Sequence, residues 1–219
     1  MIRSTLELLI LHALFGAAGY AAFHYLHAPQ LGEALLLIVL AYNLVLPLYA
    51  RARGDYDALD LWLFLLPLSV FQVAPDWMLS QLLGILVFPD LGAPRLGSVP
   101  VYMAGLWVAP LFWAVWLGRR SVWLVAALAL AIFGGAEYFA RPLHLWYAQG
   151  VREYGGVALY VLLPEALLGL ATGYAYLRSR DAAGLARPFI AALVSVFYSG
   201  ALVMAYFLSE RADWHLHVG

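Results

Sequence analysis

Long apolar runs constrain this chain more than any other feature of its sequence. A helix that crosses a bilayer needs about 20 mostly apolar residues, and six stretches of this kind are present. They are Leu6–Leu26, Leu31–Ala50, Val99–Leu117, Ser121–Phe139, Gly156–Leu177 and Arg187–Leu208. Charged residues make up only 11% of the 219-residue chain, against about 25% in soluble domains. The sequence therefore predicts an all-α polytopic membrane bundle that forms a single transmembrane domain over residues 1–219.

A further apolar stretch, Leu59–Phe88, is longer than one crossing needs and too short for two. As one helix it would extend roughly 45 Å at about 1.5 Å per residue, and Pro67 and Pro75 can each kink it. We interpret it as a single crossing, so that the chain has seven transmembrane helices and the third is long and broken near Pro75. Irregular backbone at membrane depth needs protein or a water-filled cavity around it.

The arginines support this count, because basic residues accumulate in cytoplasmic loops. With seven crossings and the N-terminus inside, one group of arginines lies on the cytoplasmic side and a smaller group lies outside. The cytoplasmic group is Arg3, Arg51, Arg53, Arg119, Arg120, Arg178, Arg180 and Arg187, and the outer group is Arg95, Arg141, Arg152 and Arg211. Two crossings in Leu59–Phe88 would remove this bias. We expect an integral protein of a prokaryotic inner membrane, with its C-terminus outside.

Composition also excludes several classes of function. With no cysteine, the chain has no disulfide and no thiolate metal site. Its basic and acidic residues, 12 and 13, are balanced, so it lacks the basic footprint of a nucleic-acid-binding protein. Every basic residue is arginine, which excludes a retinal Schiff base on lysine. His12, His24 and His27 lie at different depths of the first helix, and we favour hydrogen-bonded histidines over metal ligands. We therefore expect no cofactor and no metal.

Titratable residues inside a membrane span are costly and often functional. Here the acids and histidines gather in the extracytoplasmic half of the spans, whereas the inner half holds only His12, Asn43 and neutral hydroxyls. The outer set is His24, His27, Glu33, Asp76, Asp90, Glu137, His144, Glu165 and Glu210. This asymmetry predicts a polar site near the outer face of the bundle.

Glu165 is the strongest single candidate for chemistry. Pro164 precedes it and loosens the local backbone hydrogen bonds, and helical spacing places Gly169, Thr172 and Tyr176 on the same face. One hypothesis is a buried carboxyl that gives or takes a proton during catalysis, with Thr172 and Tyr176 in contact with the substrate. The alternative is a structural glutamate that bonds to a neighbouring helix.

Asp76 lies in a similar setting in the third helix. Pro75 precedes it, and helical spacing places Ser69, Gln72 and Ser80 on its face. Acids at broken helices often line cavities in transporters and membrane enzymes, so Asp76 is a second catalytic candidate and Gln72 a substrate contact. The alternative is that Asp76 caps the helix that restarts after the proline.

Glu137 and Arg141 are four residues apart at the outer end of the predicted fifth helix. This spacing favours a local ion pair that anchors the helix end. A functional alternative is that Arg141 binds an anionic head group while Glu137 orients it. Glu137 is then a third catalytic candidate.

Acids and aromatic rings together suggest an enzyme that acts on a lipid. Two carboxyls in different environments can take acid and base roles, and aromatic faces stabilise a developing carbocation. The candidate rings are Tyr102, Trp107, Trp113 and Tyr198. In length, helix number and the intramembrane acids Glu165, Asp76 and Glu137, the chain resembles the small seven-helix integral-membrane terpene cyclases. The resemblance implies cyclisation, isomerisation or hydration of an isoprenoid or other lipid at the extracytoplasmic half.

Two other functions remain open from the sequence. In a small proton-coupled transporter the same acids would be relay groups, and a polar path through Asn43, His12 or the segment Ser195–Ser199 would reach the cytoplasmic side. In a non-enzymatic lipid-binding or assembly factor the acids would be structural, and no internal cavity is expected. The partner we expect is a membrane lipid or isoprenoid substrate and not a nucleic acid, and the sequence leaves the oligomeric state undefined.

Overall fold

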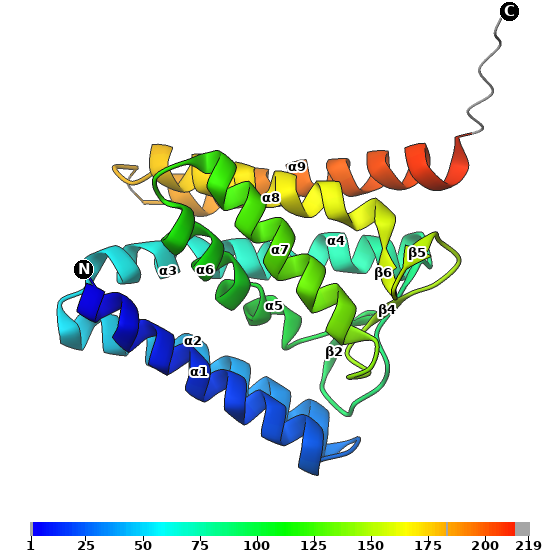
Figure 1. Ribbon diagram of the computed structural model, residues 1–219, viewed down its shortest axis with the longest axis horizontal. Helices are drawn as coiled ribbons and strands as arrows, with labels where there is room; N and C mark the ends of the chain where they lie inside the picture. The colour runs from blue at the N-terminus through cyan, green and yellow to red at the C-terminus, as the bar shows by residue number, and fades with distance from the viewer. Residues whose placement is uncertain (1, 183, 213–219) are drawn as a thin grey trace, which may run out of the picture.

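The chain runs back and forth between two ends of the molecule, as Figure 1 shows for the computed structural model, which describes residues 2–182 and 184–212. Within these residues, six helical segments are long and apolar enough to cross a membrane. They are Thr5–Tyr25, Gln30–Arg53, Tyr56–Leu82, Val122–Ala140, Leu159–Arg178 and Ala186–Arg211. The shorter apolar segment Met103–Gly118 is the seventh helical segment of the bundle. The predicted all-α bundle of seven helical segments is confirmed.

The helices are joined by short loops and capped at one end by short strands. The long helices are α1 (Ile2–Tyr25), α2 (Gln30–Arg53), α3 (Tyr56–Phe71), α7 (Val122–Ala140), α8 (Leu159–Arg178) and α9 (Ala186–Tyr206). The short ones are α4 (Val73–Trp77), α5 (Met103–Leu106), α6 (Val108–Gly118) and the π-helical turns η1 (Met78–Leu82) and η2 (Phe207–Arg211). The helices α3 and α6 to α9 enclose a core in which Phe64, Leu111 and Leu168 are completely buried. The helices α1 and α2 lie side by side at an angle to this core (Figure 1).

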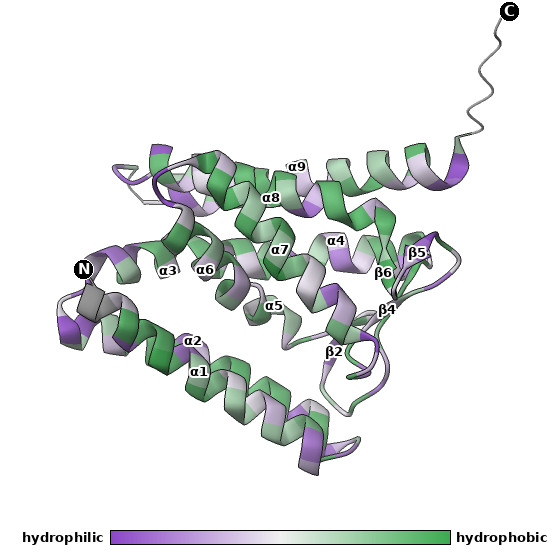
Figure 2. Ribbon diagram, viewed as in Figure 1, coloured by the Kyte–Doolittle hydropathy of each residue, from purple (hydrophilic) through white to green (hydrophobic). Residues whose placement is uncertain are grey.

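Hydrophobic side chains also cover the outside of the bundle. The hydropathy colouring in Figure 2 shows apolar residues along every long helix, including faces that no other helix covers. Trp123, Leu163 and Val196 are 74%, 65% and 68% exposed. Large apolar surfaces of this kind mark contact with a membrane or a partner, so the outer faces of these helices suit a lipid environment.

The third crossing is broken, as predicted, and the break has a clear chemical cause. Pro75 has no N–H to donate to the carbonyl of Phe71, four residues earlier, and α3 ends at Phe71. The hydroxyl of Ser195 on α9 donates to that carbonyl at 2.9 Å. A side chain from the last helix therefore replaces the backbone bond that the proline removes. The segment continues through α4 and η1, and the chain then turns into the short strand β1 (Leu86–Val87).

The predicted span Val99–Leu117 begins later than expected. Its first residues form the strand β3 (Val99–Pro100), which pairs with β2 (Arg95–Leu96), and helix starts only at Met103. The loop between Pro89 and Ser98 is thus a structured turn, as its glycines and prolines predict. Asn43 fixes the start of this crossing, because its amide donates to the carbonyls of Val39 and Gly105 and accepts from the Trp62 indole.

A small lid of strands covers the end of the bundle that holds the acids. β1 pairs antiparallel with β4 (Tyr147–Ala148), and β5 (Glu153–Tyr154) pairs with β6 (Val157–Ala158). Gln149 strengthens the first pair, since its side chain donates to the Gly84 carbonyl at 2.9 Å. The lid joins the end of the third crossing to the loop after α7, and so closes the space between them.

Candidate functional site

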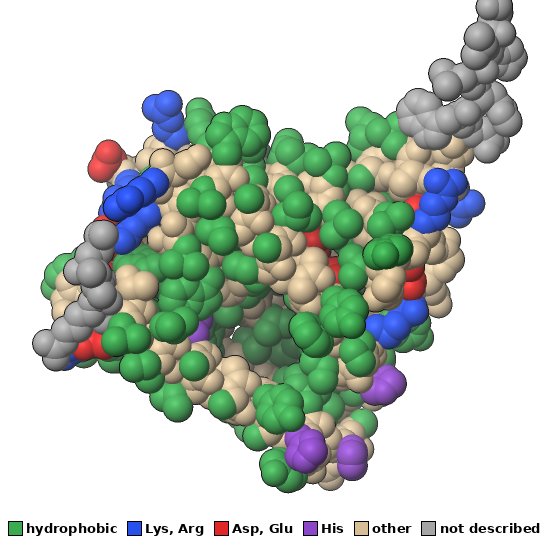
Figure 3. All heavy atoms as spheres, viewed as in Figure 1, with side chains coloured by type: hydrophobic (Ala, Val, Ile, Leu, Met, Phe, Trp, Pro, Cys, Tyr) green, Lys and Arg blue, Asp and Glu red, His purple; other side chains and the backbone are tan. Residues whose placement is uncertain are grey.

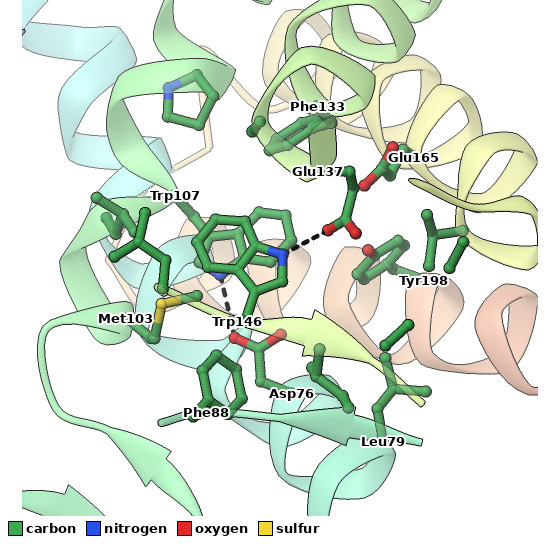
Figure 4. Close-up of a pocket in the computed structure, with 18 of the residues that line it drawn as sticks. Asp76, Leu79, Phe88, Met103, Trp107, Phe133, Glu137, Trp146, Glu165 and Tyr198 are labelled. Carbon is green, nitrogen blue, oxygen red and sulfur yellow. Dashed lines mark hydrogen bonds between the residues drawn. The ribbon is translucent and has the colours of Figure 1, made fainter. Parts of the chain in front are cut away.

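Three carboxyl groups line one internal cavity of about 280 Å³ beneath the lid. Asp76 comes from α4, Glu137 from the end of α7 and Glu165 from the first half of α8. Figure 4 shows their side chains converging from three sides, with Leu79, Phe88 and Met103 among the apolar groups around them. The three acids that the sequence singles out for catalysis are therefore neighbours in space.

Tryptophan indoles hold two of these carboxyls. The N–H of Trp107, between α5 and α6, donates to Oδ2 of Asp76 at 3.3 Å. The N–H of Trp146, in the lid, donates to Oε1 of Glu137 at 2.7 Å (Figure 4). An indole carries one donor and no acceptor, so each pairing fixes one carboxyl oxygen and leaves the other oxygen open to further contacts.

Glu165 differs from the other two acids. Its side chain is 2% exposed, and Oε2 has no hydrogen-bond partner among the described residues. Buried polar atoms in proteins are nearly always partnered by protein or water. Glu165 lines the cavity, so this unpartnered oxygen is an unsatisfied polar group within the cavity wall.

Local packing explains why Glu165 sits where it does. One turn further along α8, Gly169 brings the helix against α7 so closely that an added Cβ would lie 2.3 Å from Cβ of Ala129. Small residues allow such close helix approach in membranes. Because α7 also carries Glu137, this contact fixes the relative position of Glu137 and Glu165.

Aromatic rings form much of the cavity wall. The ring centroid of Trp107 lies 5.1 Å from that of Phe133 and 6.0 Å from that of Tyr198. Phe88, Trp146 and Tyr160 also line the cavity. Aromatic faces carry negative electrostatic potential and attract cations, so the wall suits a ligand on which positive charge develops. Trp107 and Tyr198, both predicted substrate contacts, lie in this cavity.

Several other predicted contacts lie outside the cavity wall. Gln72 and Thr172 are fully buried, and neither side chain has a hydrogen-bond partner in the part of the chain that the structure describes. Tyr176 packs against Phe64 on α3, far along α8 from Glu165. Tyr102 lines a second cavity, introduced below. These four residues therefore do not line the cavity of the three acids.

The predicted contact between Glu137 and Arg141 is wrong. Glu137 bonds to Trp146, whereas Arg141 forms an ion pair with Glu153 at 2.9 Å and donates to the Ala148 carbonyl. The side chain of Arg141 is 47% exposed at the end of the bundle that carries the lid. The lid supplies Arg141 with partners that lie closer than Glu137, so this arginine ties the lid together instead of facing the cavity.

Asp76 does not cap a helix, which was the structural alternative for this residue. It lies within α4, is 4% exposed, and its carboxyl accepts the Trp107 indole. Trp146 is the main site residue that the sequence did not reveal, because it lies in a loop outside the apolar runs. Only the pairing of β1 with β4, two distant segments, brings this ring over the cavity.

A second, larger cavity of about 860 Å³ adjoins the first. We call it the lateral groove; α1 and α2 form one wall, and α5, α6 and Ile132 of α7 form the other. Figure 3 shows a hollow with hydrophobic walls on this face of the molecule. His12, Tyr102 and Trp113 line the groove. Over residues 2–182 and 184–212, no group of three histidines or acids is placed to hold a metal ion.

Fold and site together define a helical membrane protein with an internal cavity that is apolar, aromatic and lined by three carboxyls. Residues 73–209 match the family described as a domain of unknown function, DUF6989. Because the match covers more than half of the chain, the protein belongs to this family, and all three acids fall within the matched region. No curated protein matches the chain, and no solved structure does.

Proposed function

We propose that the protein is an integral-membrane enzyme that performs acid–base chemistry on an isoprenoid or another lipid with a carbon–carbon double bond or an epoxide. The observation that carries this proposal is the convergence of Asp76, Glu137 and Glu165 on one apolar cavity. Burying ionisable groups in a membrane protein is costly, and three of them at one position favour a shared chemical task over three structural roles.

The geometry suggests how the work is divided. Glu165 lines the cavity and has one oxygen without a hydrogen-bond partner, so it serves as the proton donor, while Asp76 or Glu137, oriented by its indole, serves as the base. The donor protonates the alkene or epoxide, which leaves a carbocation that the rings of Trp107 and Tyr198 stabilise. The base then removes a proton from a neighbouring carbon and a new double bond forms. One proton enters and one leaves, so an isomerisation or cyclisation needs no further reactant.

The polar residues of the inner half argue against a transport path. His12 bonds to Tyr42 and the Leu8 carbonyl, and Asn43 is fully engaged with its neighbours. Ser195 donates to a carbonyl of α3, and Ser199 donates to the Ser195 carbonyl. All four have partners within the protein, which leaves them no free groups for relaying ions. The cavity itself is unexpected for a purely structural assembly factor.

We place the acids at the extracytoplasmic half of a prokaryotic inner membrane, with the N-terminus inside. The distribution of arginines supports this orientation, because basic residues accumulate on the cytoplasmic side. Most of them lie at the end of the bundle opposite the lid, where α2, α6 and α8 end. The arginines at this end are Arg51, Arg53, Arg119, Arg120, Arg178, Arg180 and Arg187. A reporter fused after the last residue tests the orientation, and a cytoplasmic C-terminus would overturn it.

Deuterium incorporation tests the chemistry for any lipid substrate that is protonated at carbon. Membranes that contain the protein are incubated with isoprenoid lipids in D2O, and mass spectrometry then identifies any product that has gained deuterium at carbon. We expect Glu165→Gln to abolish this product, because the amide keeps the shape but cannot donate the acidic proton. Glu33→Gln, at an exposed acid near the same end, is the matched control. Full product formation by Glu165→Gln would refute the assignment.

A further inference from the structure

The lateral groove is mostly apolar, and two of its polar residues, His12 and Thr5, are hydrogen-bonded within the protein, whereas the buried hydroxyl of Tyr102 has no partner among the described residues. Nδ1 of His12 lies 2.8 Å from the Leu8 carbonyl, and Nε2 lies 2.7 Å from the Tyr42 hydroxyl. Because a carbonyl only accepts, Nδ1 carries the proton, and Nε2 of the neutral ring accepts from Tyr42. Thr5 accepts from the Trp116 indole. With these groups satisfied inside the protein, the groove suits an apolar occupant.

The groove and the acid cavity meet along a common wall. Leu106, Ala109, Pro110 and Leu145 line both spaces. Trp107 belongs to the acid cavity, and Trp113, six residues further along the chain, belongs to the groove. At about 1.5 Å per residue, the backbone positions of these two residues are roughly 9 Å apart along the helix axis. The two spaces therefore adjoin along this wall.

The position of the groove also indicates the source of its occupant. It lies between helices whose outer faces are apolar and suited to lipid, and it is visible as a hollow on that surface (Figure 3). A protein helix is about 10 Å across with its side chains, and it could not extend from the groove into the acid cavity of about 280 Å³. A flexible hydrocarbon chain can fill both.

We propose that the lateral groove holds the non-reacting tail of the substrate, an isoprenoid chain that enters sideways from the bilayer and places its reacting end among Asp76, Glu137 and Glu165. This inference rests on the proposed function for the identity of the reacting end. It adds that the substrate is longer than the acid cavity alone accommodates, and that the groove selects chain length.

Chain-length dependence of binding tests the groove. The probes are geraniol, farnesol and geranylgeraniol, which lengthen by one isoprene unit at each step, and native mass spectrometry of the purified full-length protein gives their affinities. We expect affinity to rise about tenfold along the series. Gly16→Phe should reduce this rise to within about twofold while geraniol binds as before. Gly16 and Gly19 line the groove, and a Cβ at either position has no atom within 4 Å.

Two further variants keep the test decisive. Gly19→Leu fills the groove with a smaller side chain and replaces Gly16→Phe in the test if that variant does not fold. We expect it to lose the rise in affinity with chain length in the same way. Gly200→Phe, at an exposed position of α9 where a Cβ also has no atom within 4 Å, is the control and should behave as wild type. A rise in affinity that both groove variants retain would overturn the proposal. The proposal would also be overturned if the wild-type protein bound none of the three alcohols. A third contradicting result is that the groove variants lose geraniol binding as much as they lose binding of the longer alcohols.

The variant Glu165→Gln separates this inference from the proposed function. If it loses deuterium incorporation but keeps the dependence on chain length, both proposals are supported. If it keeps full incorporation while Gly16→Phe still removes the length dependence, the catalytic assignment fails and the groove proposal holds. If Glu165→Gln loses incorporation while the groove variants keep a normal dependence on chain length, the groove proposal fails and the catalytic assignment holds.

Discussion

The contact between Gly169 and Ala129 predicts a measurable coupling between α7 and α8. A Cβ added at Gly169 would lie 2.3 Å from Cβ of Ala129 and 3.0 Å from the Val125 carbonyl oxygen. Carbon atoms pack at about 3.5–4.0 Å, so Gly169→Ala must separate the two helices by more than about 1 Å. Overpacking of this kind costs about 1–3 kcal/mol. The alanine recovers about 1 kcal/mol through its higher helix propensity, which leaves a net loss of about 0–2 kcal/mol.

A double-mutant cycle isolates the steric term from the propensity terms. Ala129→Gly removes the clashing methyl group, so Gly169→Ala in that background should cost nothing or stabilise the protein. We expect a coupling of at least about 1 kcal/mol between the two sites, in the range seen for residues in contact. Gly135→Ala is the control on α7, because a Cβ there has no atom within 4 Å.

The assay is reversible unfolding of the purified protein in detergent, followed by circular dichroism. Deuterium incorporation by the same variants reports the catalytic consequence, since α7 carries Glu137 and α8 carries Glu165. The single variant Gly169→Ala should lose activity, and the double variant should recover it. Additive effects, with a coupling close to zero, would refute the packing argument.

Individual hydrogen bonds give three further predictions. Ser195→Ala should lower the free energy of unfolding by about 1 kcal/mol, because a carbonyl in the bundle loses its partner; Ser199→Ala, which loses only a bond to its own helix, should change it less. Trp146→Phe removes the indole donor to Glu137. We expect about a tenfold lower rate of deuterium incorporation, which corresponds to about 1.4 kcal/mol of activation free energy, and little change in the free energy of unfolding. Unchanged incorporation would contradict this role of Trp146. Asn43→Ala breaks bonds to α3 and α5 and should lower stability by about 1–3 kcal/mol, as thermal denaturation in detergent will show.

The sequence predicted the spans and the principal acids because both depend on strong local costs. A charged group within an apolar run is costly wherever the helix packs. Asp76 and Glu165 could therefore be identified as candidate site residues from the sequence around each of them, without knowledge of their neighbours in space. Helix number followed from the length of the runs and the placement of the arginines. The break near Pro75 followed from the missing N–H of proline.

Contacts that depend on distant segments were beyond such reasoning. Trp146 reaches the cavity only because Leu86–Val87 pairs with Tyr147–Ala148 across the lid. Arg141 has a neighbour four residues away on its helix, but the lid provides Glu153 instead. In both cases the path of an irregular loop determines which residues come into contact. That path depends on how the helices of the bundle are assembled and cannot be predicted from the periodicity of the local sequence.

The bond from Ser195 to the Phe71 carbonyl has a consequence for biogenesis. Helices enter the membrane in chain order, so the third crossing is inserted long before α9 is synthesised. Until then, the carbonyl that Pro75 leaves free has no partner from α9, and an unsatisfied backbone group in hydrocarbon is unfavourable. The third crossing is therefore incomplete on insertion, and the arrival of the last helix both finishes its backbone bonding and fixes the segment that presents Asp76.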